Sequence, residues 1–159
     1  MRSIDLRKDT GFVNQYIELR NTHANTLLTL PVDMESTLEW LRRTDIDVIG
    51  LIEGNTLLGA VIIYYNRKGE ITFIAKEPGK GIGGKLLVLI EELALKKRLD
   101  YIWAWTLIDN FAAQRAFEKN GFRNCGVVTK HFCGQRKGAI KFIKPLNDLD
   151  SQYCCPITL

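Results

Sequence analysis

The sequence predicts a mixed α/β fold whose central sheet is mainly antiparallel and contains one parallel pair of strands. Three β-branched and aliphatic runs between residues 47 and 75 are joined by short polar turns, which predicts an antiparallel meander. A glycine-rich loop and an amphipathic stretch separate the third run from a fourth, and this strand, helix, strand order predicts a parallel pair. Two further runs near the C-terminus predict a closing hairpin.

The individual elements follow in order along the chain. Apolar residues at near-helical spacing predict a first helix over 11–20, which the short polar side chains of 21–25 interrupt. The sequence Ser36-Thr37-Leu38-Glu39 has the spacing of a capping box, so a second helix is predicted to begin near Ser36. The remaining predicted elements are strands at 47–52, 57–65 and 70–75, a helix ending in the basic cluster 96–98, a strand at 101–108, a helix at 111–120, and hairpin strands at 126–132 and 138–143 joined by 133–137.

The composition fits one globular domain. The chain has 159 residues, 46% hydrophobic and 25% charged, which is enough to bury a full core. We assign the domain to residues 1–146 and treat 147–159, which has no interpretable period, as a C-terminal tail. The net charge of +4 comes from scattered basic residues, so we expect a small anionic ligand and no nucleic-acid partner. No stretch could span a bilayer, so we expect a soluble cytoplasmic protein without a membrane partner, and homo-oligomerisation stays open.

The four cysteines do not suggest a metal site. Cys125, Cys133 and the adjacent Cys154 and Cys155 do not form paired C-x-x-C motifs, and the two histidines lie far apart in the sequence. We therefore expect no metal, and free thiols in a reducing compartment.

A glycine-rich run opens the helix that follows the third strand. Residues 78–87 read Pro-Gly-Lys-Gly-Ile-Gly-Gly-Lys-Leu-Leu, and with a helix N-terminus beside them the exposed amides predict a phosphate-binding loop. Gly79, Gly81 and Gly84 also satisfy the G-x-G-x-x-G pattern of dinucleotide-binding domains, with Asp109 at the end of the next strand. Such domains repeat the parallel crossover, and only one is visible here, so a nicotinamide-binding domain is the less favoured alternative.

Two motifs, together with the order of elements, resemble the GNAT N-acetyltransferase superfamily over nearly the whole chain. The segment 79–87 is similar to that family's pyrophosphate loop, R-G-x-G-I-G-x-x-L-L, and 110–122 is similar to its signature N-x-x-A-x-x-x-Y-E-K-x-G-F. The resemblance implies a sheet whose parallel strands splay apart, with helices on both faces. It also implies an enzyme that transfers an acetyl group from acetyl-coenzyme A directly to a primary amine. A noncatalytic module that binds or senses acyl-coenzyme A is an alternative of another class.

The resemblance further implies where the cosubstrate binds. The pyrophosphate would lie on the loop amides, and the pantetheine arm would pair like an added strand with the backbone of 74–76. Strand amides near Ile74 and Ala75 would polarise the thioester carbonyl. Asn110 would hydrogen-bond the arm, a role that can coexist with capping the next helix. The implied cosubstrate-binding residues are Ile74, Ala75, Lys76, Gly79, Lys80, Gly81, Ile82, Gly83, Gly84, Lys85, Asn110 and Phe117.

Two residues depart from the family pattern. Pro78 stands where an arginine or glutamine usually opens the loop, so we expect a tighter turn and a greater share of phosphate binding for Lys80. Phe117 occupies the position of a tyrosine that protonates the departing thiolate in many members, and phenylalanine cannot do so. Either water supplies this proton or another hydroxyl does, with Tyr64 or Tyr65 as the candidate acid. Only one of the two can face the cleft, because strand side chains alternate.

Glu70 is the candidate general base. An alkyl ammonium has a pKa of about 10.4 and must lose a proton before it can attack. Glu70 begins the strand that leads into the glycine-rich run, although another alignment of the short loop moves the match toward Arg67. A solvated glutamate beside a turn is the alternative role. His131 on the terminal hairpin is a second candidate base.

The acceptor is expected to be a small molecule. The segments that frame it in the family, 20–30 and 127–137, are polar and net basic here, which suits an anionic molecule better than a basic peptide. Candidate acceptor-binding residues are Arg20, Asn21 and His131. The segments 16–21 and 37–41 also resemble family members that acetylate amino sugars carried on nucleotides. A peptide or protein acceptor is the alternative.

Overall fold

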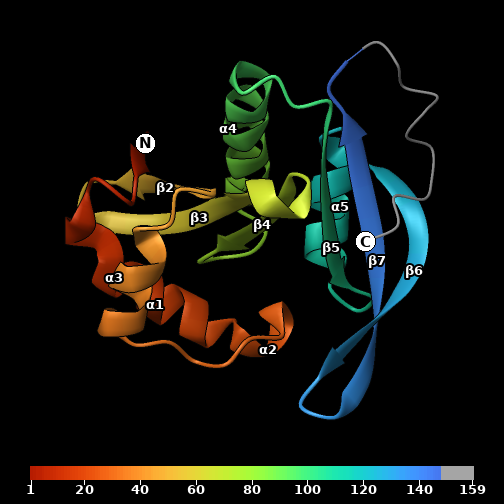
Figure 1. Ribbon diagram of the computed structural model, residues 1–159, viewed down its shortest axis with the longest axis horizontal. Helices are drawn as coiled ribbons and strands as arrows, with labels where there is room; N and C mark the ends of the chain where they lie inside the picture. Colours follow the sequence, from red (N-terminus) through yellow and green to blue (C-terminus); the bar gives the residue numbers. More distant parts are fainter. Residues whose placement is uncertain (148–159) are drawn as a thin grey trace.

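A computed structural model describes residues 1–147 as a seven-stranded sheet with helices on both faces (Figure 1). The strand order is β1-β2-β3-β4-β5-β7-β6, and all neighbouring pairs are antiparallel except β4 and β5. The strands are β1 Arg2–Asp5, β2 Ile46–Glu53, β3 Thr56–Tyr64, β4 Glu70–Ala75, β5 Tyr101–Leu107, β6 Arg123–Phe132 and β7 Gln135–Pro145. The predicted fold class is confirmed.

The helices divide between the two faces of the sheet, and the helices on each face cover a separate apolar cluster. They are α1 Val13–Thr22, α2 Ala24–Leu27, α3 Met34–Leu41, α4 Ile82–Lys96 and α5 Phe111–Lys119, with 3-10 turns at Thr10–Phe12 and Tyr65–Arg67. Figure 1 shows α1, α2 and α3 gathered on one side of β2, β3 and β4, with α4 on the other side. In α4 the buried residues Leu86, Leu87, Ile90 and Ala94 recur at three- and four-residue spacing, and they pack with Phe117 of α5.

The second predicted helix begins earlier than expected. α3 starts at Met34, and Asp33 is its N-cap, whose carboxylate accepts a hydrogen bond of 2.8 Å from the Ser36 amide. The Ser36 hydroxyl in turn accepts one of 3.3 Å from the Asp33 amide. The predicted start at Ser36 was wrong because aspartate caps a helix as well as serine does, and the earlier cap adds most of a turn.

Strand β1 was missed by the sequence analysis. It lies at the edge of the sheet and pairs with β2, and its residue Ile4 and the following Leu6 are buried in the cluster beneath α1 and α3. The alternating pattern contains only two apolar residues, which is too short to predict a strand, because the other residues of the segment are polar or charged. The polar segment 21–25 is also more helical than predicted, because α1 continues to Thr22 and α2 begins at Ala24.

The closing hairpin is longer than predicted, and its turn is correspondingly shorter. β6 ends at Phe132 and β7 begins at Gln135, so only Cys133 and Gly134 form the turn. Both have positive φ, +50° and +76°, as a two-residue hairpin turn of the favoured type requires. The predicted five-residue link was wrong because cysteine is not a usual signal for this conformation.

The structure also bears on the expectations about membrane spans, the C-terminal tail and the cysteines. None of the helices in residues 1–147 is long and apolar enough to cross a membrane. The predicted tail lies outside the described residues apart from Asn147, and so do Cys154 and Cys155, whereas Cys133 is a free thiol.

Candidate active site

Strands β4 and β5 part at the centre of the sheet. Within the described residues a single bridge joins them, between Glu70 and Trp103, where the Trp103 amide donates a 3.2 Å hydrogen bond to the Gly69 carbonyl. Beyond it β5 pairs with β7 as far as Leu107, while β4 pairs with β3. A cavity of about 130 Å³ lies at this parting, lined by residues of β3, β4, β5, α1, α2 and α5. The predicted splay is confirmed.

The parted edge of β4 presents backbone hydrogen-bonding groups to the gap. The Lys76 amide donates to the Leu58 carbonyl at 2.8 Å, so the even-numbered residues of this strand direct their backbone groups to β3. The odd-numbered residues therefore face β5, and past the bridge they are Phe73 and Ala75. The expectation that Ile74 and Lys76 present their amides to a ligand was wrong for this reason of alternation. Ala75 does face the gap, and Phe73 was missed.

The glycines of the loop differ in what their lack of a side chain provides: two have a backbone conformation that favours glycine, and a third leaves room for a neighbouring ring. Gly79 and Gly81 both have φ of +76°, with open space around the position of a Cβ atom. Gly81 is the N-cap of α4, and a glycine has no side chain that could bond the helix's first amides. At Gly83, by contrast, a Cβ atom would lie 2.8 Å from the Phe73 ring, so a larger residue would displace that ring. At Gly84 a Cβ atom would lie 3.5 Å from the Asn120 side chain, which is an ordinary contact.

The other residues of the loop also take distinct positions. Lys80 is exposed beside the loop glycines. Lys85 is exposed as well, and its ammonium lies 3.4 Å from the Met1 sulfur. The Ile82 side chain is buried in the core, so only its backbone can face a ligand. The amides at the start of α4 and the charge of Lys80 are features that suit an anion, and the phosphate-binding loop stays a prediction.

Glu70 lies at the bridge between β4 and β5 and is buried, with 6% of its surface exposed. The Trp105 indole donates a 3.2 Å hydrogen bond to its Oε1, and the Arg67 guanidinium donates one of 3.2 Å to its Oε2. Glu70 lines the cavity and is not a solvated residue beside a turn. Trp105 and Arg67 line it too, and neither was a predicted site residue.

The basic groups around Glu70 extend to the closing hairpin. The Lys130 ammonium on β6 lies 4.8 Å from the centre of the Trp105 ring. Burial lowers the pKa of Lys130, and the neighbouring Glu70 carboxylate opposes this shift. The guanidinium of Arg67 also stacks over the Tyr64 ring at 4.2 Å.

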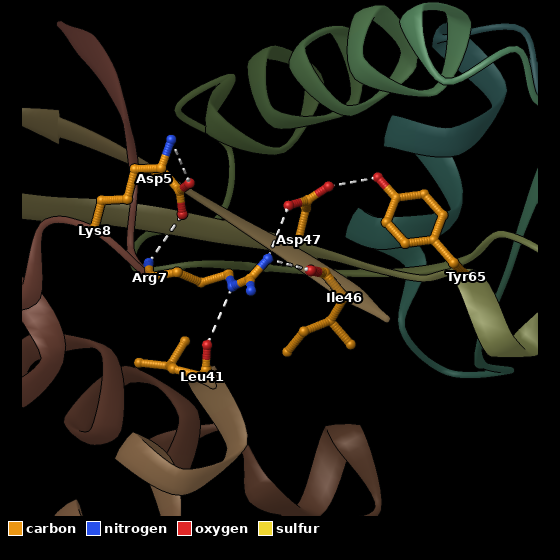
Figure 2. Close-up of polar contacts among 7 residues, drawn as sticks. All are labelled: Asp5, Arg7, Lys8, Leu41, Ile46, Asp47 and Tyr65. Carbon is orange, nitrogen blue, oxygen red and sulfur yellow. Dashed lines mark hydrogen bonds and ion pairs between the residues drawn. The ribbon is translucent and has the colours of Figure 1, made fainter. Parts of the chain in front are cut away.

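The two candidate acids lie on opposite sides of the sheet. Tyr64 lines the cavity, and burial raises the pKa of its hydroxyl. Tyr65 instead donates a 2.6 Å hydrogen bond to Asp47, whose other oxygen accepts from Arg7 at 3.3 Å (Figure 2). Arg7 also donates to the carbonyls of Leu41 and Ile46, at 3.1 and 2.9 Å. Burial, followed by the bond to Asp47, raises the pKa of Tyr65. Tyr65 is thus part of a network that joins the end of α3 to β2.

We expect Tyr65→Phe to affect stability and not turnover. The change removes the hydroxyl bonded to Asp47 and should lower the free energy of unfolding by about 1 to 2 kcal/mol, as measured by denaturant titration. Tyr64→Phe is the matched comparison, because it removes the neighbouring hydroxyl that lines the cavity. A loss of turnover in Tyr65→Phe as large as that in Tyr64→Phe would contradict this division of roles.

The signature of the last predicted helix also lies at the cavity. Asn110 lines the cavity and caps α5, since its side chain accepts a 3.3 Å hydrogen bond from the Ala113 amide. The cap uses the side-chain oxygen of Asn110, and the side-chain nitrogen can still donate to a ligand. Capping and ligand binding are therefore compatible. Phe117 lines the inner end of the cavity and is 2% exposed, packed against Phe73 at a ring separation of 5.3 Å.

The three candidate acceptor-binding residues do not come together. Arg20, in the last turn of α1, lines the cavity. The Asn21 side chain is used structurally, because it bonds both the amide and the carbonyl of Val32 at 2.9 Å. His131 is exposed on β6 opposite Arg136 and does not line the cavity. The register of the hairpin, which sequence spacing does not reveal, carries it beyond the site.

Comparison with known proteins identifies the class of this enzyme. The model of the acetyltransferase (GNAT) family matches residues 15–122. The chain therefore belongs to the GNAT family and is an N-acetyltransferase of a family that uses acetyl-coenzyme A. This assignment replaces the nicotinamide-binding alternative. No curated protein sequence matches the chain significantly.

Solved structures share the fold over most of the chain. The ribosomal-protein-alanine N-acetyltransferase of Brucella melitensis is 20% identical, with a TM-score of 0.80, covering 92% of this chain and 100% of that one. A Salmonella typhimurium protein solved with its cofactor acetyl-CoA is 17% identical, with a TM-score of 0.81 and coverage of 92% and 94%. The spermidine N-acetyltransferase of Vibrio cholerae, in complex with CoA and spermine, is 17% identical, with a TM-score of 0.77 and coverage of 91% and 95%. At these identities the likeness establishes the fold.

Proposed function

We propose that this enzyme transfers the acetyl group of acetyl-coenzyme A directly to the primary amine of a small molecule, with Glu70 as the general base. The observation that carries the proposal is the position of the Glu70 carboxylate. It is buried in the cavity where β4 and β5 part, and the Arg67 guanidinium and the Trp105 indole each donate a hydrogen bond to it. A carboxylate in the cavity wall can accept a proton from an ammonium group that binds beside it.

The residues around the parting fit acetyl-coenzyme A. The backbone groups of Phe73 and Ala75 face the gap, where an amide-containing arm would pair with them as an added strand. The loop glycines and the first amides of α4 lie directly after this edge and suit the phosphates. The cosubstrate supplies an acetyl group activated as a thioester, and the amide of Phe73 or Ala75 is placed to polarise its carbonyl.

The proton balance requires one base and no dedicated acid. An ammonium acceptor and a thioester give an amide, a thiol and one proton. Glu70 accepts the first proton of the ammonium and passes it to solvent, and the second proton of the amine leaves with the thiol. Phe117 contributes no proton, and the phenolic hydroxyl of Tyr64 in the cavity wall can relay a proton to the departing thiolate.

The acceptor side of the cavity favours a small molecule. Leu27 and Thr29, from α2 and the segment after it, and Tyr64 of β3 form walls close to Glu70. Such a space suits an amine on a compact molecule, including an amino sugar carried on a nucleotide whose remainder extends outward. It gives an extended peptide less room.

A panel of amines tests the proposal. Purified enzyme with acetyl-coenzyme A is offered amino-sugar nucleotides, amino acids, polyamines and peptides, and thiol release is followed together with product mass. We expect acetylation of at least one class of small amine. Activity on peptides alone would overturn the small-molecule acceptor, and tight coenzyme A binding without acetylation of any amine would overturn the catalytic role of the site.

A further inference from the structure

Arg20 brings an uncompensated positive charge to the acceptor side of the cavity. It lies in the last turn of α1, and its guanidinium makes no hydrogen bond or ion pair with the residues from 1 to 147 that the structure describes. The other charged residues that line the cavity, Arg67 and Glu70, bond each other. An arginine that faces a cavity without a counterion is suited to an anionic ligand.

Two hydroxyl groups beside Arg20 also have no partner. The Thr29 hydroxyl is buried without a hydrogen bond among the described residues, and Thr29 lines the same cavity. The Tyr16 hydroxyl is likewise buried and unbonded within that part of the chain, and its charged and polar neighbours are Arg20 and Tyr64. Buried hydroxyls normally have partners, and those left without one in a folded enzyme point to a missing group. Both hydroxyls can donate, and Arg20 can only donate, so the missing group is an acceptor of hydrogen bonds.

The position of Arg20 relative to Glu70 indicates which functional groups a single acceptor molecule would need. Tyr64 pairs with Glu70 across β3 and β4 and lines the same cavity as Arg20, and both charges act on its hydroxyl. A single acceptor can therefore place its amine at Glu70 and a second group at Arg20. Because Arg20, Arg67 and Lys130 are all positive, a polyamine would meet repulsion there.

We infer that the acceptor is a primary amine that also carries an anionic oxyacid group, and that Arg20 binds this group together with the Thr29 hydroxyl. The inference rests on the proposed function and adds the substrate class. Carboxylate and phosphate share the required chemistry, because each offers several oxygen atoms to a guanidinium and to hydroxyl donors.

Matched pairs of amines test this inference. Phosphoethanolamine is compared with ethanolamine, and amino acids are compared with the amines formed by removing their carboxylate, by kcat/KM at fixed acetyl-coenzyme A. We expect the anionic member of at least one pair to be favoured about 10-fold or more, as for a hydrogen bond to a charged group. A preference in the phosphoethanolamine pair would identify the anionic group as a phosphate, and a preference in the amino-acid pairs would identify it as a carboxylate.

Variants connect the preference to the named residues. Arg20→Gln should lower kcat/KM for the amine with the anionic group about 10- to 100-fold and leave that for its partner without this group within about 3-fold. Arg20→Lys should retain part of the preference, and Thr29→Val, which keeps the side-chain volume, should reduce it without removing it. Arg42→Gln at the exposed end of α3 is the matched control and should behave as wild type.

The outcomes distinguish this inference from the proposed function. Equal or better use by the wild-type enzyme of the amines that lack the anionic group would overturn the anionic acceptor while leaving amine acetylation in place. An Arg20→Gln enzyme whose kcat/KM falls equally for both amines of a pair would also overturn the anionic acceptor. If the wild-type enzyme acetylates no small amine, the proposed function and this inference fall together. The wild-type comparison decides the matter even where a variant fails to fold.

Discussion

Glu70→Gln should lower kcat/KM for the amine acceptor about 100- to 10,000-fold near neutral pH, the usual contribution of a general base. Glutamine keeps the shape of the side chain, and its carbonyl oxygen can still accept the hydrogen bond from Trp105. It cannot take up a proton from the ammonium group. Thiol release measured against amine concentration, at saturating acetyl-coenzyme A, checks the effect.

The pH dependence of this variant gives a sharper test. The neutral fraction of an alkyl amine grows as the pH approaches its pKa of about 10.4, so less of the rate depends on a base and the deficit should narrow. Glu53→Gln, at the exposed end of β2, is the control and should leave the rate unchanged. A Glu70→Gln enzyme with the wild-type rate and pH profile would remove Glu70 as the base.

Phe117→Ala should lower the free energy of unfolding by about 3 to 5 kcal/mol. Phe117 is 2% exposed, and its ring packs against those of Phe73, Phe122 and Phe142 at separations of 5.3, 5.1 and 5.1 Å. Alanine would leave a cavity among the three rings. Because domains of this kind are stable by about 5 to 15 kcal/mol in total, much of the stability depends on this side chain. Denaturant unfolding measures the change.

The same helix offers a matched control. Phe111 is 63% exposed at the start of α5, so Phe111→Ala should change the free energy of unfolding by only about 0.5 kcal/mol or less. Similar losses in the two variants would show that Phe117 is not the centre of this cluster. The residue that replaces the family's tyrosine would then lack the structural role assigned to it.

The central elements of the fold could be predicted because their sequence signals are strong. β3 and β5 contribute side chains to both faces of the sheet, and such strands read as continuous apolar runs. The missed or misplaced elements carry weaker or competing signals. β1 buries one apolar side chain within its four residues, and α3 has two overlapping capping patterns. In each case a tertiary contact decides between local alternatives that the sequence leaves nearly equal.

The candidate site was predictable where the residues are adjacent in the chain. The glycine-rich loop and Asn110 could be located from their motifs, and alternation limited the cleft to one of Tyr64 and Tyr65. Choosing Tyr64 required the register of β3 against β4, which pairs it with Glu70. Trp105 could not be found from the sequence, because it meets Glu70 only through the bridge between β4 and β5, 35 residues apart. The donors around Arg20 depend on packing in the same way.

The single bridge between β4 and β5 also bears on how long the enzyme persists in a cell. It leaves the sheet as two sections, β1 to β4 and β5 to β7, with few backbone hydrogen bonds between them. In the proposed binding mode the cosubstrate supplies the missing hydrogen bonds along β4, and a ligand that binds only the folded state stabilises it in proportion to the logarithm of its concentration. The abundance of acetyl-coenzyme A would then set the resistance of the protein to proteolysis as well as the rate at which it acetylates.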